Sequence, residues 1–285
     1  MKAKLGIIGG TGFYELQGLE IKRKVSLETP FGRPSDKLII SEKDGQEVIF
    51  LSRHSRGHVL IPSNINYRAN IYAMKIFGVT HLVSVSTVGS FKEEIKPSSV
   101  VFVDQFFDRT KIYIQDTFFD DNIAVHIAFG DPVCPILHSA LIDIATSAGV
   151  DFTPQGIYLN IDGPAFSTRA ESMIYRSWGV SVIGMTNIYE AKLSREAEIH
   201  FGTIAQVTDF DSWYGESVDV TEVFSNLGKA LESTTKVLQG LIEKFPLSDG
   251  DCNCDYALEN AIVTDRSIIS DDVRNKYDLF LKKYF

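Results

Sequence analysis

The sequence predicts an α/β fold in which short buried strands alternate with amphipathic helices. Short apolar runs, bounded by glycine or polar residues, are typical of strands. Between them lie longer segments whose apolar residues recur at helical spacing. Polar side chains stand repeatedly where the apolar runs end, and the packing of buried strands does not require them there. Because ligands of open α/β sheets bind at strand ends, this repetition predicts a small-molecule site.

The composition limits the classes of function. The 285 residues are 44% hydrophobic and 23% charged, which fits one large α/β domain or two small ones. A net charge of −9 argues against binding to nucleic acid or to an anionic membrane. No apolar run approaches the roughly 18 residues that span a bilayer. The segment Met1–Lys4 leads directly into a strand rather than into a signal sequence, so we expect a cytoplasmic protein.

The first expected strand, residues 5–9, runs straight into a glycine-rich turn. Gly10 and Gly12 let backbone N–H groups approach an anion closely, and the hydroxyl of Thr11 adds a donor. A dinucleotide fingerprint is not met, because Glu15 stands where that motif has glycine or alanine. An ordinary tight turn explains the glycines equally well.

The remaining elements follow the same alternation. We expect helices at 62–78, 135–149, 169–178, 189–198 and 218–245, and strands at 37–42, 47–52, 81–90, 99–103, 156–161, 180–185 and 202–207. The first two of these strands form a hairpin around Asp44 and Gly45. Ser167 is the expected cap of the helix that begins at Arg169. Residues 110–131 look irregular, and a polar break at 246–255 precedes a tail, 257–285, that we expect to be helical.

A cluster of basic side chains follows the hairpin, at Arg53, His54, Arg56 and His58. Arginine presents a planar fork that matches phosphate, and histidine adds a donor whose charge can be tuned. A solvated basic loop is the alternative. We favour an anion site because the cluster directly follows a strand end.

Other strand ends carry hydroxyl groups or carboxylates. Ser86 and Thr87 lie near the end of one strand, Thr186 follows another, and Asp209 and Asp211 follow the strand at 202–207. Two carboxylates so close cannot easily both stay ionised in a desolvated site, so one pKa should rise, which prepares a general acid. A turn or cap role explains the two aspartates equally well or slightly better when they are taken alone. A metal site there has weak support without further ligands.

Several of these segments together resemble the purine nucleoside phosphorylase family, and within it the S-methyl-5′-thioadenosine phosphorylase branch. The matching motifs are Ile7-Ile-Gly-Gly-Thr-Gly12, Arg53-His54-x-Arg56-x-His58, Asn66-Tyr-x-Ala-Asn70, Val88-Gly-Ser90, Asp104-Gln105-Phe106, Gly163-Pro164-x-Phe-Ser-x-Arg-Ala-Glu171, Gly184-Met-Thr186 and Thr208-Asp-Phe-Asp211. The resemblance implies a single α/β domain with a central mixed, partly barrel-like sheet flanked by helices. It covers residues 1–245 as a phosphorylase domain and leaves 246–285 as a C-terminal extension.

The resemblance also implies a reaction, phosphorolysis, in which phosphate attacks the sugar anomeric carbon and the purine leaves. The implied phosphate-binding residues are Thr11, Arg53, His54, Ser86, Thr87 and Thr186. Met185 would lie against the ribose, Phe166 and Ser167 would border the base, and Val220 would line the 5′ pocket. Asp209 would donate to purine N7 and Asp211 would support it near the exocyclic amine. His126 would reach the site of a neighbouring subunit.

Further expectations concern cofactors, assembly and substrate. The family needs no metal or cofactor besides phosphate as co-substrate, and it forms trimers or hexamers. Cys252-Asn-Cys254 resembles a C-terminal Cys-x-Cys disulfide of some relatives, whereas we interpret Cys134 as a buried apolar filler and His200 as structural or surface. Carboxylates beside the base favour a 6-amino purine. Serine at 55, alanine at 165 and tyrosine at 189 depart from the family pattern, which leaves inosine or guanosine cleavage and a non-catalytic nucleoside-binding protein as alternatives.

Overall fold

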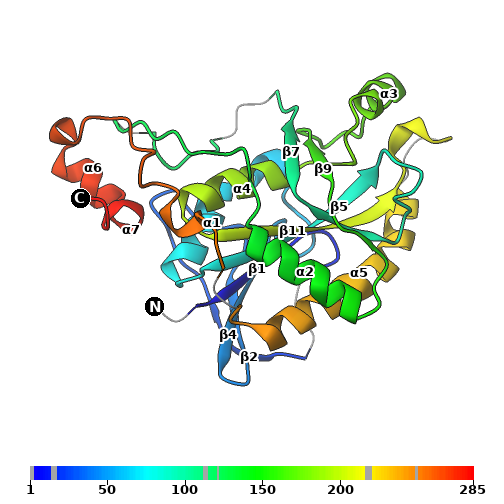
Figure 1. The fold of residues 1–285 in the computed structure, drawn as a ribbon, viewed down its shortest axis with the longest axis horizontal. Helices are drawn as coiled ribbons and strands as arrows, with labels where there is room; N and C mark the ends of the chain where they lie inside the picture. Colours follow the sequence, from blue (N-terminus) through cyan, green and yellow to red (C-terminus); the bar gives the residue numbers. More distant parts are fainter. Residues whose placement is uncertain (1–2, 14–17, 112–114, 121, 216–219, 248–249) are drawn as a thin grey trace.

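The computed structural model describes residues 3–13, 18–111, 115–120, 122–215, 220–247 and 250–285. They form one α/β domain built on a mixed 11-stranded sheet with helices on both faces, as the sequence predicts (Figure 1). The strands are β1 (Leu5–Gly9), β2 (Glu20–Val25), β3 (Leu38–Lys43), β4 (Gln46–Ser52), β5 (His81–Ser90), β6 (Val100–Val103), β7 (Gln105–Asp108), β8 (Phe152–Thr153), β9 (Ile157–Asn160), β10 (Val182–Gly184) and β11 (His200–Asp209).

The sheet branches at β5. One path runs β2-β3-β4-β1-β5-β10-β9-β7, while β11 pairs with β5 on the other side and carries β6 and β8 beyond it. β6 and β7 are consecutive in the chain, so the two branches meet again at Asp104. There the carboxylate of Asp104 accepts a hydrogen bond from the N–H of Gly156 at 2.8 Å. This closure gives the sheet its partly barrel-like curl.

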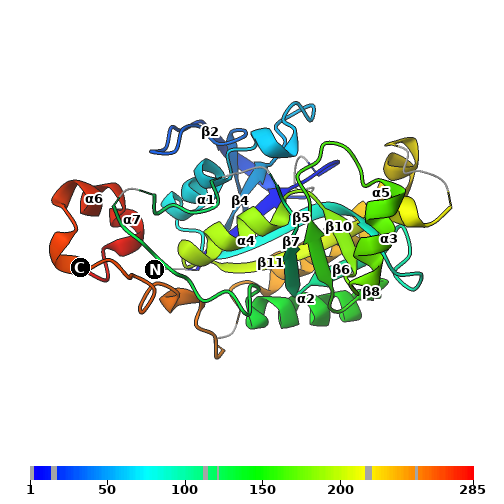
Figure 2. The same cartoon turned by 90° about the horizontal axis from the view of Figure 1, so that it is seen from above.

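Two helical layers cover the sheet, and Figure 2 shows α1 and α4 on one side of β11 and α2 on the other. The longer helices are α1 (Tyr67–Ile76), α2 (Pro135–Ser147), α3 (Arg169–Ser177), α4 (Asn187–Glu196) and α5 (Val220–Lys244). α5 packs beside α2 and against β11. Every residue of β11 is buried, because helices cover both of its faces.

The starts of two helices and the cap of a third differ from the sequence prediction. The helix expected from residue 62 starts as a short 3₁₀ turn, η1 (Pro62–Asn64), and α1 begins only after Asn66, whose side chain accepts from the N–H of Ala69. Thr168, not Ser167, caps α3 and forms a capping box with Glu171. α4 begins two residues earlier than expected, so that Thr186 stands at its N-cap.

The sequence pattern gave no sign of β2, whose residues are almost all exposed. An edge strand that faces water on both sides has no apolar alternation, and its charged residues are typical of such edges.

The C-terminal segment contains short helical turns rather than one continuous helix. These are η3 (Cys254–Tyr256), η4 (Arg266–Ile268), α6 (Asp271–Lys276) and α7 (Asp278–Leu281), at the opposite end of the molecule from α3 in Figure 1. Its apolar residues, among them Leu258, Tyr277 and Phe280, are buried in the same core cluster as residues of α1 and α4. No helix in the described part of the chain is long and apolar enough to cross a membrane.

Candidate active site

A cleft of about 440 Å³ opens where five segments of the sheet edge meet. These segments are the turn after β1, the end of β4, the end of β5, the β10–α4 junction and the end of β11, closed by the first turn of α5. The predicted site residues that line this cleft are Thr11, Arg53, His54, Ser86, Thr87, Phe166, Ser167, Met185, Thr186, Asp209, Asp211 and Val220. A cavity of this size holds a small organic ligand.

Arg53 lies at the floor of the cleft in a buried ion pair that the sequence analysis did not anticipate. Its Nε donates to Glu190 Oε1 at 2.5 Å and its Nη2 to Glu190 Oε2 at 2.8 Å. Burial opposes the charged guanidinium, but the carboxylate of Glu190 offsets this and the pKa of Arg53 is raised. Arg53 therefore carries its charge permanently into the protein interior.

The remaining bonds of Arg53 limit what it can offer an anion. Nη2 also donates to Ser84 Oγ at 2.5 Å and Nη1 to the carbonyl of Val85 at 3.0 Å. Four of the five N–H groups are thus engaged. The fifth belongs to Nη1, which lies so near Gly10 that a Cβ there would come within 2.9 Å of it. Among the described residues, one N–H of Arg53 has no partner and remains for the cleft, whereas the sequence predicted a fork of two donors.

His54 follows Arg53 and lies in contact with the carbonyl of Leu60, 2.8 Å from its Nδ1. Burial and the neighbouring charge of Arg53 lower the pKa of His54 to about 3, so the ring is neutral near pH 7. A carbonyl accepts only, which places the single ring proton on Nδ1. His54 Nε2 is then an acceptor, and the tunable donor that the sequence predicted is absent.

Hydroxyl groups and a helix start complete the anion-binding side. Ser86 Oγ lies 3.0 Å from the hydroxyl of Tyr158, whereas Thr87 Oγ1 is buried with no hydrogen-bond partner among the described residues. Thr186 is buried at the N-cap of α4, and its side chain makes no capping bond. Helix N-termini favour negative charge because their first N–H groups lack intrahelical partners. An anion here would meet donors from three directions.

The two aspartates lie on the facing wall, and a β-bulge places them. The pairing of β11 with β5 shifts between Val207 and Asp209, which brings Asp209 opposite Gly89. A Cβ on Gly89 would come within 2.7 Å of Asp209 Oδ1, so a side chain there would displace the carboxylate. Asp209 Oδ1 accepts the N–H of Asp211 at 2.8 Å, and Asp209 Oδ2 accepts the hydroxyl of Thr208 at 2.9 Å.

Asp211 opens the short helix η2 (Asp211–Trp213) with a left-handed backbone, φ 50°. Burial raises the pKa of its carboxyl, and a hydrogen bond from the hydroxyl of Ser172 on α3 offsets this only partly. From the sequence, one carboxyl pKa of the pair was expected to rise through mutual repulsion. In the structure, desolvation is the largest cause of the raised pKa of Asp211.

Apolar side chains close the far end of the cleft. Val220, Val223 and Phe224 from the first turns of α5 face Ile61 and Pro62. Among the described lining residues, this end has no charged side chain. The two histidines of the cleft, His54 and His58, have lowered pKa values.

The residues that depart from the family pattern lie outside this lining. Tyr189 is buried within α4 and packs on Tyr67, with ring centroids 4.7 Å apart. Ala165 is exposed. Ser55 adopts a left-handed backbone with φ 61°, which explains why glycine suits that position.

His126 is the predicted site residue that the structure does not bring to the cleft of its own chain. It is exposed, and its N–H donates to the carbonyl of Ala261 at 2.8 Å.

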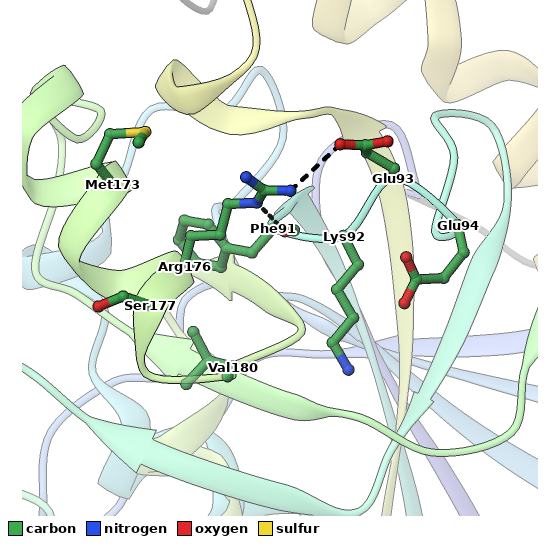
Figure 3. Close-up of a pocket in the computed structure, with 9 residues that line it drawn as sticks. Phe91, Lys92, Glu93, Glu94, Met173, Arg176, Ser177 and Val180 are labelled. Atoms are coloured by element: carbon green, nitrogen blue, oxygen red, sulfur yellow. Dashed lines mark hydrogen bonds and ion pairs between the residues drawn. The ribbon is translucent and has the colours of Figure 1, made fainter.

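A second hollow lies behind the aspartate wall, between α3 and the segment after β5. Figure 3 shows Arg176 turned toward Glu93, with Nη2–Oε1 at 3.3 Å, and its Nε donating to the carbonyl of Phe91 at 3.1 Å. The same guanidinium stacks 3.9 Å from the ring centroid of Trp213. Arg176 is thus committed to holding η2 in place, and this hollow supports the site rather than forming it.

The sequence analysis missed the residues that hold Arg53, chiefly Glu190, Ser84 and Asn187. Asn187 Nδ2 donates to Ser84 Oγ at 2.7 Å and to Glu190 Oε2 at 3.1 Å. A signal was present, because Asn187 and Glu190 stand three apart on a helix and Ser84 interrupts an apolar strand. Such polar residues in buried elements require partners.

Fold and cleft together define an α/β protein whose cleft sets hydrogen-bond donors opposite paired carboxylates. The chain belongs to the phosphorylase superfamily, whose family model matches residues 4–243. It is 45% identical over 286 residues, 100% of both chains, to the S-methyl-5′-thioadenosine phosphorylase of Geobacter sulfurreducens. The protein of the same name from Nitrosopumilus maritimus is 42% identical over 258 residues, 90% of this chain and 97% of that one. The family resemblance predicted from the motifs is confirmed.

Solved structures agree. A methylthioadenosine phosphorylase from an Antarctic soil metagenomic library superposes with a TM-score of 0.90 at 41% identity, covering 98% of this chain and 99% of that one. A mutant adenosine/methylthioadenosine phosphorylase from Schistosoma mansoni, in complex with methylthioadenosine, gives a TM-score of 0.84 at 32% identity, covering 87% and 93%.

Proposed function

We propose that this chain is a pentosyltransferase that cleaves S-methyl-5′-thioadenosine with inorganic phosphate, giving adenine and 5-methylthioribose 1-phosphate. The observation that carries the proposal is that the anion donors and the aspartate pair line one cleft. The names of the two relatives, at 45% and 42% identity over 100% and 90% of this chain, support the same reaction.

Phosphate binds on the side formed by Thr11, Arg53, Ser86, Thr87 and Thr186. The free Nη1–H of Arg53 and the unpartnered hydroxyl of Thr87 donate to its oxygens, and the start of α4 adds a favourable field. His54 contributes as an acceptor for the proton of a monoprotonated phosphate, because its Nε2 carries a lone pair. The site therefore selects phosphate in its singly protonated form.

Bond cleavage proceeds through a sugar that carries positive charge. A phosphate oxygen forms a bond to the anomeric carbon as the bond from that carbon to N9 breaks. The electron pair of the breaking bond moves into the purine. Asp209 donates a proton to N7, which neutralises that charge, while the phosphate anion stabilises the sugar cation. Asp211, held by Ser172, accepts from the 6-amino group and so favours adenine. Met185 contacts the ribose, and Phe166 and Ser167 border the base.

The 5′-substituent sits at the apolar end formed by Val220, Val223 and Phe224. A methylthio group gains from contact with these side chains, whereas a 5′-hydroxyl loses its water without a partner. We therefore place S-methyl-5′-thioadenosine ahead of adenosine. Adenosine remains the second candidate, because the Schistosoma mansoni relative is named for both substrates.

A homo-oligomer, trimer or hexamer, fits the position of His126, which lies away from the cleft of its own chain. In an oligomer it reaches the sugar side of the neighbouring site. Catalysis uses no cofactor beyond phosphate as co-substrate, and the enzyme acts in the cytoplasm in purine and methionine salvage.

A panel of nucleosides, assayed with and without phosphate, tests the function. We expect adenine release from S-methyl-5′-thioadenosine only when phosphate is present. Preferred cleavage of inosine or guanosine would point instead to a phosphorylase for another purine nucleoside. Nucleoside binding with no base release in the presence of phosphate would contradict an enzyme and favour a binding protein.

A further inference from the structure

The three cysteines of the chain gather around one histidine, far from the cleft lining. Cys134, His200, Cys252 and Cys254 each point one ligand atom into the same space, and these atoms all lie within 4.8 Å of one another. His200 Nδ1 is 3.2 Å from Cys134 Sγ and 3.4 Å from Cys252 Sγ. All but Cys252 are buried.

These separations are close to those of a tetrahedral metal site. Zinc binds thiolate at about 2.3 Å and imidazole at about 2.0–2.1 Å, so neighbouring ligand atoms stand about 3.5–3.8 Å apart. The two sulfur–nitrogen distances, 3.2 and 3.4 Å, fall just below that range, and a bound ion would hold the atoms slightly further apart. Three thiols and an imidazole are the soft donor set that selects zinc over magnesium or calcium.

The surroundings prepare the histidine for that role. His200 Nε2 lies 3.3 Å from Asp255 Oδ2, which fixes the ring proton on Nε2 and leaves Nδ1 as the ligand. His81 stacks on the ring with centroids 4.2 Å apart. Carboxylate–histidine–metal relays of this kind orient ligands in zinc proteins.

The ligands also come from rigid and separate parts of the fold. Cys134 is the N-cap of α2, and its N–H donates to the carbonyl of Phe201 at 2.8 Å. His200 is the first residue of β11. Cys252 and Cys254 lie near the start of the C-terminal segment that follows α5, on either side of Asn253.

The disulfide expected from the resemblance is not formed. All three cysteines are free thiols, and Cys134 is not a mere apolar filler, because it faces the other two across His200. An odd number of thiols cannot pair completely among themselves, whereas all three fit a single metal ion.

We propose that Cys134, His200, Cys252 and Cys254 bind one zinc ion as a closed structural site that fastens residues 246–285 to the sheet. Four protein ligands leave no open position for substrate, so the ion is structural rather than catalytic. None of the four lines the cleft. A zinc ion at this site therefore takes no part in the proposed reaction.

The zinc site acts on the C-terminal segment through its neighbours. Leu258, four residues beyond Cys254, is fully buried and its N–H donates to Glu198 at 3.1 Å. Tyr277 and Phe280 pack in the same core cluster as α4. Loss of the metal frees the start of this segment, so stability falls while the chemistry in the cleft is retained.

Metal analysis of the purified, reduced full-length protein tests the proposal. We expect about one zinc per chain, a lower melting temperature after chelation, and recovery when zinc is restored. Cobalt substitution should give the visible ligand-field bands of a tetrahedral thiolate site. Protein that is folded, reduced and supplied with zinc, yet holds less than about a tenth of an equivalent after desalting, would overturn the proposal.

Variants separate this site from adventitious binding. Cys254→Ser and His200→Gln should each lose most of the zinc, whereas His138→Gln, a histidine on α2 outside the cluster, should keep it. Unchanged zinc in Cys254→Ser would contradict the assignment. A Cys252–Cys254 disulfide, found by peptide mapping of protein prepared in the presence of a thiol reductant, would contradict it as well.

Discussion

Arg53 and Glu190 form a bidentate ion pair in which both side chains are almost completely shielded from water, at 1% and 0% exposure. The pair lies directly beneath the anion-binding side of the cleft. Both charged groups make a further hydrogen bond. Arg53 Nη2 donates to Ser84 Oγ, and Asn187 Nδ2 donates to Glu190 Oε2. The pair fixes the guanidinium so that one N–H faces Gly10, and the geometry of the phosphate site follows from it.

Glu190→Gln should cost stability because it leaves the buried charge of Arg53 without its counterion. Removing one partner of a buried pair typically costs about 3–5 kcal/mol. Denaturant unfolding measures this loss. Glu232→Gln, which removes an exposed partner of Lys236, is the matched control and should cost far less, because solvent screens that pair. Equal losses in the two variants would contradict the structural role of the pair.

Glu196 should contribute less to the stability of the protein at neutral pH than at mildly acidic pH. Burial raises its pKa from 4.5 to about 7, against hydrogen bonds from Phe118 and Thr117. The folded pKa lies above the unfolded one, so the native state holds a proton that the unfolded chain releases. The free energy of unfolding therefore falls as pH rises from about 4.5 to about 7, by about 3 kcal/mol from this group.

Glu196→Gln tests this dependence because the amide is neutral at every pH. Relative to the unmodified protein, the variant should gain stability as pH rises from 5 to 8, since it has no carboxylate to ionise. Chemical unfolding at the two pH values gives the difference. If the difference in unfolding free energy between the variant and the unmodified protein is the same at pH 5 and pH 8, Glu196 ionises normally.

Val223→Thr should shift substrate preference at the apolar end of the cleft. Threonine has nearly the shape of valine and adds a hydroxyl that can pair with a 5′-hydroxyl. We expect the ratio of kcat/KM for methylthioadenosine over adenosine to fall about 10-fold or more. The KM for phosphate serves as an internal control and should stay the same. An unchanged ratio would remove Val223 from the 5′ pocket.

Ser55→Gly should stabilise the loop after β4. The left-handed backbone of Ser55, with φ 61°, destabilises the folded state by about 1–2 kcal/mol relative to glycine. The greater conformational entropy of glycine in the unfolded chain offsets about half of that difference. A net gain of about 0.5 kcal/mol is expected in thermal unfolding. Ser147→Gly, at the end of helix α2, should lose stability by the same assay. A loss in both would show that the Ser55 side chain contributes to the turn.

The alternation of strands and helices could be predicted from the sequence because apolar spacing reports burial directly. The polar residues at strand ends were also visible, since Thr186 and Asp209 interrupt runs that packing alone would keep apolar. The β2 strand was not visible because its exposed residues carry no pattern.

The support of the site was harder to predict, since it depends on distant contacts. Glu190 stands 137 residues from Arg53, and only the fold reveals that their charges meet. For the same reason the neutral state of His54 could not be predicted, because it follows from burial and from the charge of Arg53. The cysteine cluster likewise joins residues whose spacing in the chain matches no metal motif.

Phosphorolysis by wild-type protein and by Asp209→Asn tests the central claim most directly. The assay follows adenine release from S-methyl-5′-thioadenosine at saturating phosphate. With Asp209 donating to the leaving purine, the variant should lose about 10²–10⁴-fold in kcat while the KM for phosphate changes little. Unchanged turnover in Asp209→Asn, or adenine release from the wild-type protein without phosphate, would contradict the account.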